Sequence, residues 1–192
     1  MTTQLRFLSS NEFKIKEAKD ILAAADIDVV PISHKIEELQ TTDTHKLVRD
    51  KALKAFAHSG RPLFVEHTGL YLKQLNNFPG GLTQVFWDTL QADRFSELFG
   101  NSHDTSVAAK TVIAYIDGRK HHFFEGTVEG RVSAEPKGCR DFQWDCVFIP
   151  DGHSDTFAEM GPDKKNSISM RRRALDSLAS FLAQKGVQRW VL

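Results

Sequence analysis

The stretch that most constrains the fold is PLFVEHTGL at residues 62–70, where an apolar run ends in polar side chains. The apolar half predicts a short buried strand at 62–65, and Gly69 predicts a sharp turn after it. Ligand-binding side chains commonly lie at the carboxyl ends of strands in α/β sheets. Glu66 and His67 are therefore candidate site residues, although an edge turn with a surface glutamate and histidine would produce the same pattern.

Strand and helix signals alternate along the rest of the chain, which predicts a mixed α/β fold. A hairpin is predicted around Asp117 and Gly118, because this pair is flanked by β-forming residues. The other predicted elements are strands at 5–8 and 27–31, helices through 15–25, from 42 or 43 to 58 and at 82–99, a loop at 76–81, and a last helix that Ser169 caps.

Composition narrows the class of protein. The chain has 192 residues, of which 41% are hydrophobic and 26% charged, so we expect a single domain (1–192), or two lobes that share one core. Lys and Arg number 25, and so do Asp and Glu, which gives no basic surplus for nucleic acid. Cys139 and Cys146 lack zinc-site neighbours, and no signal peptide or membrane span is evident, so a cytoplasmic location is expected.

A candidate phosphate site lies where the first strand leads into the first helix. Residues 9–14, SSNEFK, place backbone N–H groups and the positive end of the helix dipole beside Ser9, Asn11 and Lys14. Such a junction suits a phosphate group. Helix capping by serine and asparagine, with a solvated lysine nearby, is the structural alternative.

Arg171 lies in an unfavourable place for a cation. It precedes Leu175 by one helical turn, so it faces the core at the start of the last helix. A cation there opposes the helix dipole and needs an anionic or carbonyl partner. Arg172 and Arg173 point elsewhere and are expected to be solvated. A cation in such a place indicates a ligand beside Arg171.

Several motifs, taken in order, resemble those of the inosine triphosphate pyrophosphatase family, whose members hydrolyse non-canonical purine nucleoside triphosphates. The matching stretches are SSNEFK (9–14), VEHTGL (65–70), NFPGG (77–81), GCRDFQWD (138–145), FIPDG (148–152), TFAEM (156–160) and KKNSIS (164–169) followed by Arg171. The resemblance covers almost the whole chain. It implies a two-lobed α/β fold, with a mixed twisted sheet flanked by helices and a central nucleotide cleft, and a homodimer.

The resemblance also implies roles for polar residues near the phosphates. Ser9, Asn11 and Lys14 would bind the triphosphate, and Lys51 and Lys165 would add positive charge beside it. Glu38 and Glu66 would be the candidate ligands of a Mg²⁺ ion.

A second group would recognise the base. Phe142 would stack on the purine, Trp144 would line the same pocket, Asp145 would read a ring nitrogen, and Arg171 would donate to the purine 6-oxygen. A donor there selects hypoxanthine and xanthine over adenine, because a buried mismatch costs about 1–3 kcal/mol.

The chain departs from the family's pattern at catalytic positions. His67 stands where the resemblance places the catalytic aspartate, and Met170 stands where it places a base-contacting histidine. Gln143, Cys146 and Gln84 replace a glycine, a proline and a basic residue of the family. Mg²⁺ prefers oxygen ligands, so an imidazole in place of a carboxylate predicts impaired hydrolysis. The alternative is that His67 acts as general base while Glu38 and Glu66 hold the metal.

Three functions remain open from the sequence. The first is a sensor that binds inosine, deoxyinosine or xanthosine triphosphate without hydrolysing it and signals to a partner. By analogy with two-component antiviral defence systems, a sirtuin-like NADase is an expected effector. The second is a working pyrophosphatase that releases monophosphate and pyrophosphate. The third is a structural subunit without a ligand, against which the retained Lys14, Asp145 and Arg171 argue.

Overall fold

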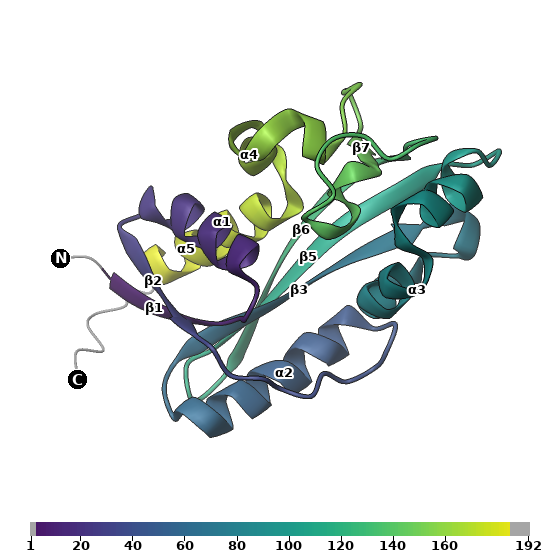
Figure 1. Cartoon of the computed structure of the whole chain (residues 1–192). Coiled ribbons are helices and arrows are strands. Elements are labelled where there is room, and N and C mark those ends of the chain that lie inside the picture. The colour runs from purple at the N-terminus through teal and green to yellow at the C-terminus, as the bar shows by residue number, and fades with distance from the viewer. Residues whose placement is uncertain (1–2, 185–192) are drawn as a thin grey trace.

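The computed structural model describes residues 3–184; residues 1–2 and 185–192, which the expected domain 1–192 includes, lie outside the described part. One seven-stranded mixed sheet runs in the order β2–β1–β3–β5–β6–β7, with β4 paired to β3 (Figure 1). The strands are β1 (Thr3–Leu8), β2 (Ile27–Ile32), β3 (Leu63–Leu72), β4 (Phe78–Pro79), β5 (Ser106–Ile116), β6 (His121–Val132) and β7 (Phe148–Pro150). The helices are α1 (Glu12–Ala23), α2 (Thr44–Ser59), α3 (Thr83–Phe95), α4 (Phe157–Ile168) and α5 (Met170–Gln184). The predicted mixed sheet flanked by helices is confirmed.

The helices cover both faces of the sheet (Figure 1). Helices α1 and α5 pack on one face, where the shared core includes Phe7, Phe64 and Leu178. Helix α2 packs on the other face, where Val48 and Val65 belong to the core. A further cluster lies at the end of the sheet that carries α3, β7 and α4. The core is therefore divided between the two faces of the sheet and one of its ends.

The central strand β3 corrects one sequence prediction. No turn occurs at Gly69; the strand continues to Leu72 and pairs with β5 along its whole length, with Gly69 opposite Lys110. The glycine is needed for a different reason, because a Cβ there would collide with the carbonyl oxygen of Gly80. Gly69 therefore allows the turn before α3 to pack directly on the strand, and Glu66 and His67 lie inside the strand.

The start of the last helix agrees with its prediction. Helix α4 ends at Ile168, and the Ser169 hydroxyl accepts a hydrogen bond from the Arg172 backbone N–H at 3.1 Å. Helix α4 itself is interrupted at Gly161, which has a φ of 74° and is followed by Pro162. No helix within residues 3–184 is long and apolar enough to cross a membrane.

Candidate functional site

Two charged clusters flank β3, and the alternation of strand side chains explains their placement. Phe64 faces α1 and α5, so Glu66, two residues on, faces the same way. Val65 faces α2, so His67 points to that opposite face. Both side chains are almost completely buried, at 2% and 6% exposure. Consecutive residues of one strand thus supply polar groups to two separate layers of the molecule.

The first cluster, here called the Arg171 network, consists of Glu17, Glu66, Asp145, Lys165 and Arg171. Arg171 donates to both Glu66 oxygens, at 2.8 Å from Nε and 3.0 Å from Nη2, and it also pairs with Glu17. Lys165 lies 2.8 Å from Glu17 and 2.5 Å from Asp145. Three carboxylates from α1, β3 and the 138–145 loop therefore share two cations from α4 and α5.

The network fixes the charge states of its members. Burial alone would raise the pKa of Glu66, but the Arg171 and Lys14 cations outweigh it and hold the pKa at about 2. Burial likewise opposes the charge on Arg171, yet Glu66 and Glu17 raise the pKa of its guanidinium further. The pair is consequently ionised throughout the physiological range.

Asp145 behaves differently from the other acids of the network. Burial raises the pKa of this carboxyl to about 6, although Lys165 opposes the shift. The side chain is therefore mainly ionised at neutral pH and takes up a proton under mild acid. Such a group accepts a hydrogen bond at pH 7 from any N–H placed against it.

The second cluster, here called the His67 cluster, consists of Glu38, Lys51 and His67. Lys51 lies 2.5 Å from Glu38 Oε1 and 3.4 Å from the Glu66 carbonyl oxygen. His67 Nδ1 is 3.8 Å from Glu38 Oε2, which is longer than a hydrogen bond. His67 Nε2 is buried and has no hydrogen-bond partner among the described residues.

His67 is uncharged in this environment. Burial, together with the nearby Lys14 and Lys51 cations, lowers the pKa of its imidazole to about 4, against the opposing effects of Glu38 and Glu66. The side chain is a neutral imidazole at pH 7. The position therefore supplies neither an anion nor a cation.

The loop before α1 lies between the two clusters. Lys14 Nζ is 3.2 Å from Glu66 Oε1, so this lysine meets the carboxylate that also pairs with Arg171. Asn11 caps α1 by accepting from the Lys14 backbone N–H at 3.1 Å, and the Ser9 hydroxyl accepts from the Asn11 N–H at 3.2 Å. The predicted residues Ser9, Asn11 and Lys14 thus surround the N-terminus of α1. Their predicted contact with a triphosphate stays a prediction.

The predicted base pocket is partly occupied by the protein's own side chains. Lys165 Nζ lies 4.0 Å from the centre of the Phe142 ring, and Phe13 approaches that ring at 5.2 Å. Trp144 is buried in the core, where it meets Phe148 edge-on at 5.7 Å. Phe142 therefore lies beside the Arg171 network, whereas the Trp144 ring belongs to the packed core at its back.

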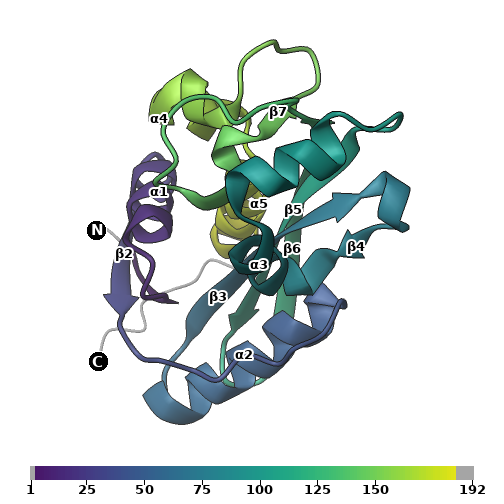
Figure 2. The same cartoon turned by 45° about the vertical axis from the view of Figure 1, so that its right-hand side comes forward.

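The 138–145 loop, which carries Phe142, lies against helix α3 (Figure 2). Arg140 makes a two-pronged ion pair with Asp93, at 2.8 and 3.0 Å. Gln143, in the left-handed region with φ of 44°, donates a hydrogen bond to Gln84. Gln84 and Gln143, which the resemblance places at a basic residue and a glycine, therefore contact each other.

The residues present do not fit a resident Mg²⁺ ion. Mg²⁺ demands near-octahedral oxygen coordination. Both Glu66 oxygens are engaged by Arg171, and Lys51 holds one oxygen of Glu38. Glu66 and His67 also point to opposite faces of the sheet. Within residues 3–184, no group of three or more His, Cys, Asp or Glu side chains is placed to hold a metal ion.

Sequence reasoning missed Glu17 and Thr68. Glu17 connects Lys165 to Arg171, and it precedes Ile21 by one helical turn on the buried face of α1. The spacing rule that identified Arg171 would also have found it. Thr68 accepts a hydrogen bond from Arg171 Nη2 at 3.3 Å and lies 2.7 Å from the Thr111 hydroxyl.

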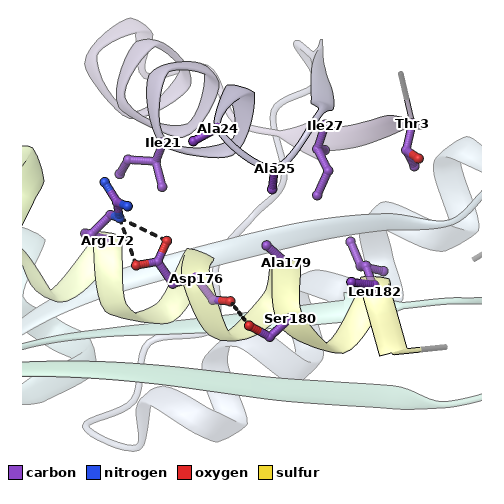
Figure 3. Close-up of a pocket in the computed structure, with 11 residues that line it drawn as sticks. Thr3, Ile21, Ala24, Ala25, Ile27, Arg172, Asp176, Ala179, Ser180 and Leu182 are labelled. Carbon is purple, nitrogen blue, oxygen red and sulfur yellow. Dashed lines mark hydrogen bonds and ion pairs between the residues drawn. The ribbon is translucent and has the colours of Figure 1, made fainter. Parts of the chain in front are cut away.

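A cavity of about 660 Å³ lies away from both clusters, between α1, the start of β2 and α5 (Figure 3). Ile21, Ile27 and Leu182 line it, with the Arg172–Asp176 ion pair at its edge. It contains none of the predicted nucleotide-binding residues.

Comparison with known proteins gives the family. The Ham1 family profile matches residues 5–181. The chain is 34% identical to a dITP/XTP pyrophosphatase of Thermococcus kodakarensis over 182 residues, which cover 94% of this chain and 98% of that protein. It is 35% identical to an inosine triphosphate pyrophosphatase of Yarrowia lipolytica over 185 residues, with 95% and 97% covered. The structure of a HAM1 protein from Coxiella burnetii, 26% identical, gives a TM-score of 0.80 and covers 95% of this chain and 100% of that one. This chain therefore belongs to the Ham1 family, as its motifs predict.

Proposed function

We propose that this protein binds non-canonical purine nucleoside triphosphates (dITP, ITP or XTP) and hydrolyses them slowly or not at all. The observation that carries the proposal is His67, a buried neutral imidazole at the position where the family resemblance places a catalytic carboxylate. The cations Lys14 and Lys51 near His67, and Lys165 and Arg171 in the Arg171 network, match those that the resemblance assigns to nucleotide binding. Binding groups are thus retained where the group for activating water is lost.

The geometry supports an orientation for the ligand. The triphosphate lies against the N-terminus of α1, beside Lys14 and Lys51, because helix N–H groups and cations both favour phosphate. The base lies beside Phe142 and Asp145. Ionised Asp145 accepts from the ring N–H of hypoxanthine, whereas adenine has no hydrogen on the corresponding nitrogen.

Arg171 has little spare capacity for reading the base. An arginine has five N–H donors, and Glu17, Glu66 and Thr68 take four of them. The remaining N–H, on Nη1, is the one left for the purine 6-oxygen. In this proposal Arg171 contributes a single donor and otherwise holds the site together.

A second candidate function is an active pyrophosphatase. The names of the relatives from Thermococcus kodakarensis and Yarrowia lipolytica favour it. This function requires Glu38 and Glu66 to leave their cations for Mg²⁺. His67 would then act as general base, but a pKa of about 4 makes it a weak one.

A ligand that is not destroyed can carry information, so we extend the proposal to a regulatory role. The protein would act in the cytoplasm, as a homodimer, on a partner effector such as a sirtuin-like NADase, in antiviral defence. Nucleotide binding shifts such an assembly only through different affinities for its resting and active forms. A coupling free energy of about 1–3 kcal/mol gives a response of roughly 5- to 150-fold.

Calorimetric titration with deoxyinosine triphosphate and adenosine triphosphate tests the base reading. Deoxyinosine triphosphate should bind more tightly, by roughly 1–3 kcal/mol, and Asp145→Asn should remove most of that preference. Asp141→Asn, an exposed acid in the same loop, is the matched control. Equal affinities in the wild type would refute the base assignment.

Pyrophosphate release from the same nucleotide, with Mg²⁺ and with Mn²⁺, separates the two candidate functions. A wild-type rate within the usual enzymatic range of about 1–1000 per second would establish the pyrophosphatase. A slow or absent reaction that His67→Asp accelerates supports the binding protein.

The regulatory role has its own experiment. The tagged wild type and Lys14→Ala are purified from the native host with and without added deoxyinosine triphosphate. A defined partner whose association responds to the nucleotide only in the wild type supports the role. Recovery of the protein without a partner in every condition counts against it.

A further inference from the structure

We infer that the site takes the nucleoside triphosphate in its metal-free form, an inference that rests on the proposed nucleotide binding. Mg²⁺ normally accompanies a triphosphate into a protein where carboxylates share the ion with the phosphates. In this site Arg171 and Lys14 hold the Glu66 carboxylate, and Lys51 holds one oxygen of Glu38. The site offers cations and backbone N–H groups to the phosphates directly.

The first step concerns Glu66, whose carboxylate is already committed. Arg171 contacts both of its oxygens, and Lys14 makes a third contact at 3.2 Å. Arg171 is 1% exposed and also pairs with Glu17, so it cannot move away from Glu66 without breaking that second ion pair. A metal ion at Glu66 would have to displace a buried cation and leave it without its partner, which is strongly unfavourable.

The second step concerns position 67. A divalent cation is needed between a triphosphate and a carboxylate because two anions at close range repel each other. An imidazole is never an anion in the range where proteins fold, so a phosphate beside His67 meets no such repulsion. The need for a bridging metal disappears together with the carboxylate.

The third step is the supply of positive charge. Lys14 Nζ lies 3.2 Å from Glu66 Oε1, and Lys51 Nζ lies 3.4 Å from the Glu66 carbonyl oxygen. Glu38 is the one carboxylate of the His67 cluster, and 34% of its side chain is exposed. Arg171 contacts both oxygens of Glu66, so Glu66 keeps a cationic partner when Lys14 turns from it to a phosphate.

The test is a calorimetric titration of the whole chain with deoxyinosine triphosphate, once in excess EDTA and once in millimolar Mg²⁺. For the wild type, the Kd in EDTA should be equal to, or lower than, the Kd in Mg²⁺. For His67→Asp, Mg²⁺ should tighten binding on the order of tenfold, because the carboxylate restores a metal ligand. His67→Asn has the shape of aspartate without its charge, and its ratio of the two Kd values should follow the wild type.

The outcomes distinguish the metal-free inference from the proposed nucleotide binding on which it rests. Wild-type binding that requires Mg²⁺ overturns the metal-free inference and leaves nucleotide binding in place. Failure to bind in either buffer overturns both. As a second readout, Mn²⁺ added to the nucleotide complex should enhance water-proton relaxation with His67→Asp and leave the wild type at the level of free Mn²⁺–nucleotide. Enhancement by the wild type would contradict the inference.

Discussion

The Arg171 network and the His67 cluster lie on opposite faces of the same strand, yet they are built in different ways. In the Arg171 network every charged group has a partner, and Arg171, Lys165 and Asp145 are each 5% exposed or less. In the His67 cluster Glu38 is one-third exposed, and the buried His67 Nε2 has no hydrogen-bond partner within residues 3–184. The first arrangement is closed and costly to change, whereas the second can accept a ligand without stranding a buried charge.

The largest expected effect comes from disrupting the Arg171 network. Arg171→Ala leaves Glu17 and Glu66 buried without their main cation, and we expect a loss of about 3–5 kcal/mol in the free energy of unfolding. For a chain of this length the melting temperature should fall by about 2–4 °C per kcal/mol. Urea unfolding followed by circular dichroism measures the loss.

The neighbouring residue provides the control for this substitution. Arg172 pairs with Asp176 one turn along α5 and is partly exposed. Arg172→Ala should therefore change the unfolding free energy by about 0.5 kcal/mol or less. Similar losses from the two variants would mean that the Arg171 network adds no more than a surface ion pair.

The next effect concerns the pH dependence of the stability that the His67 cluster contributes. The folded protein lowers the pKa of His67 from 6.5 to about 4. Between these values the unfolded chain binds more protons, so stability from His67 is present above pH 6.5 and is lost as the pH falls to about 4. The loss is about 3 kcal/mol, at 1.36 kcal/mol for each pKa unit.

His67→Asn removes this contribution. The drop in unfolding free energy between pH 7 and pH 4 should be about 3 kcal/mol smaller in the variant, since all other titrating groups are shared. His67→Gln should give the same result, which controls for the packing of one particular side chain. Parallel stability curves for wild type and variants would show that His67 is not a buried neutral imidazole.

The sequence predicted the Arg171 network better than the His67 cluster, for a physical reason. Helical spacing placed Arg171 on a buried face, and the structure confirms that placement. The same spacing applies to Glu17, but the contact joins residues 154 positions apart, and spacing within one helix does not reveal a distant partner. A face can be predicted locally, whereas the pairing depends on the assembled sheet.

Gly69 illustrates the same limit. A glycine after an apolar run favours a turn when only neighbouring residues are considered. Pairing with β5 kept the chain extended, and that pairing sets Gly69 against Lys110, which no local pattern reveals. The consequence for the site was large, because Glu66 and His67 became buried strand residues on opposite faces instead of neighbours at an exposed turn.

The smallest predicted effect tests the N-terminal cap of α1, which lies next to both clusters. Asn11 caps α1 through its side-chain oxygen, which accepts from the Lys14 backbone N–H. Asn11→Ala should cost about 1 kcal/mol of unfolding free energy, because one helix N–H loses its acceptor, and Asn11→Ser should restore most of it. Urea unfolding at pH 7 measures both variants. Helix α1 also carries Glu17 into the Arg171 network, so a loss from Asn11→Ala as large as that from Arg171→Ala would mean that the start of α1 and the network unfold as one unit. A loss near 1 kcal/mol would instead show that the cap stabilises only the start of α1, independently of the buried ion pairs.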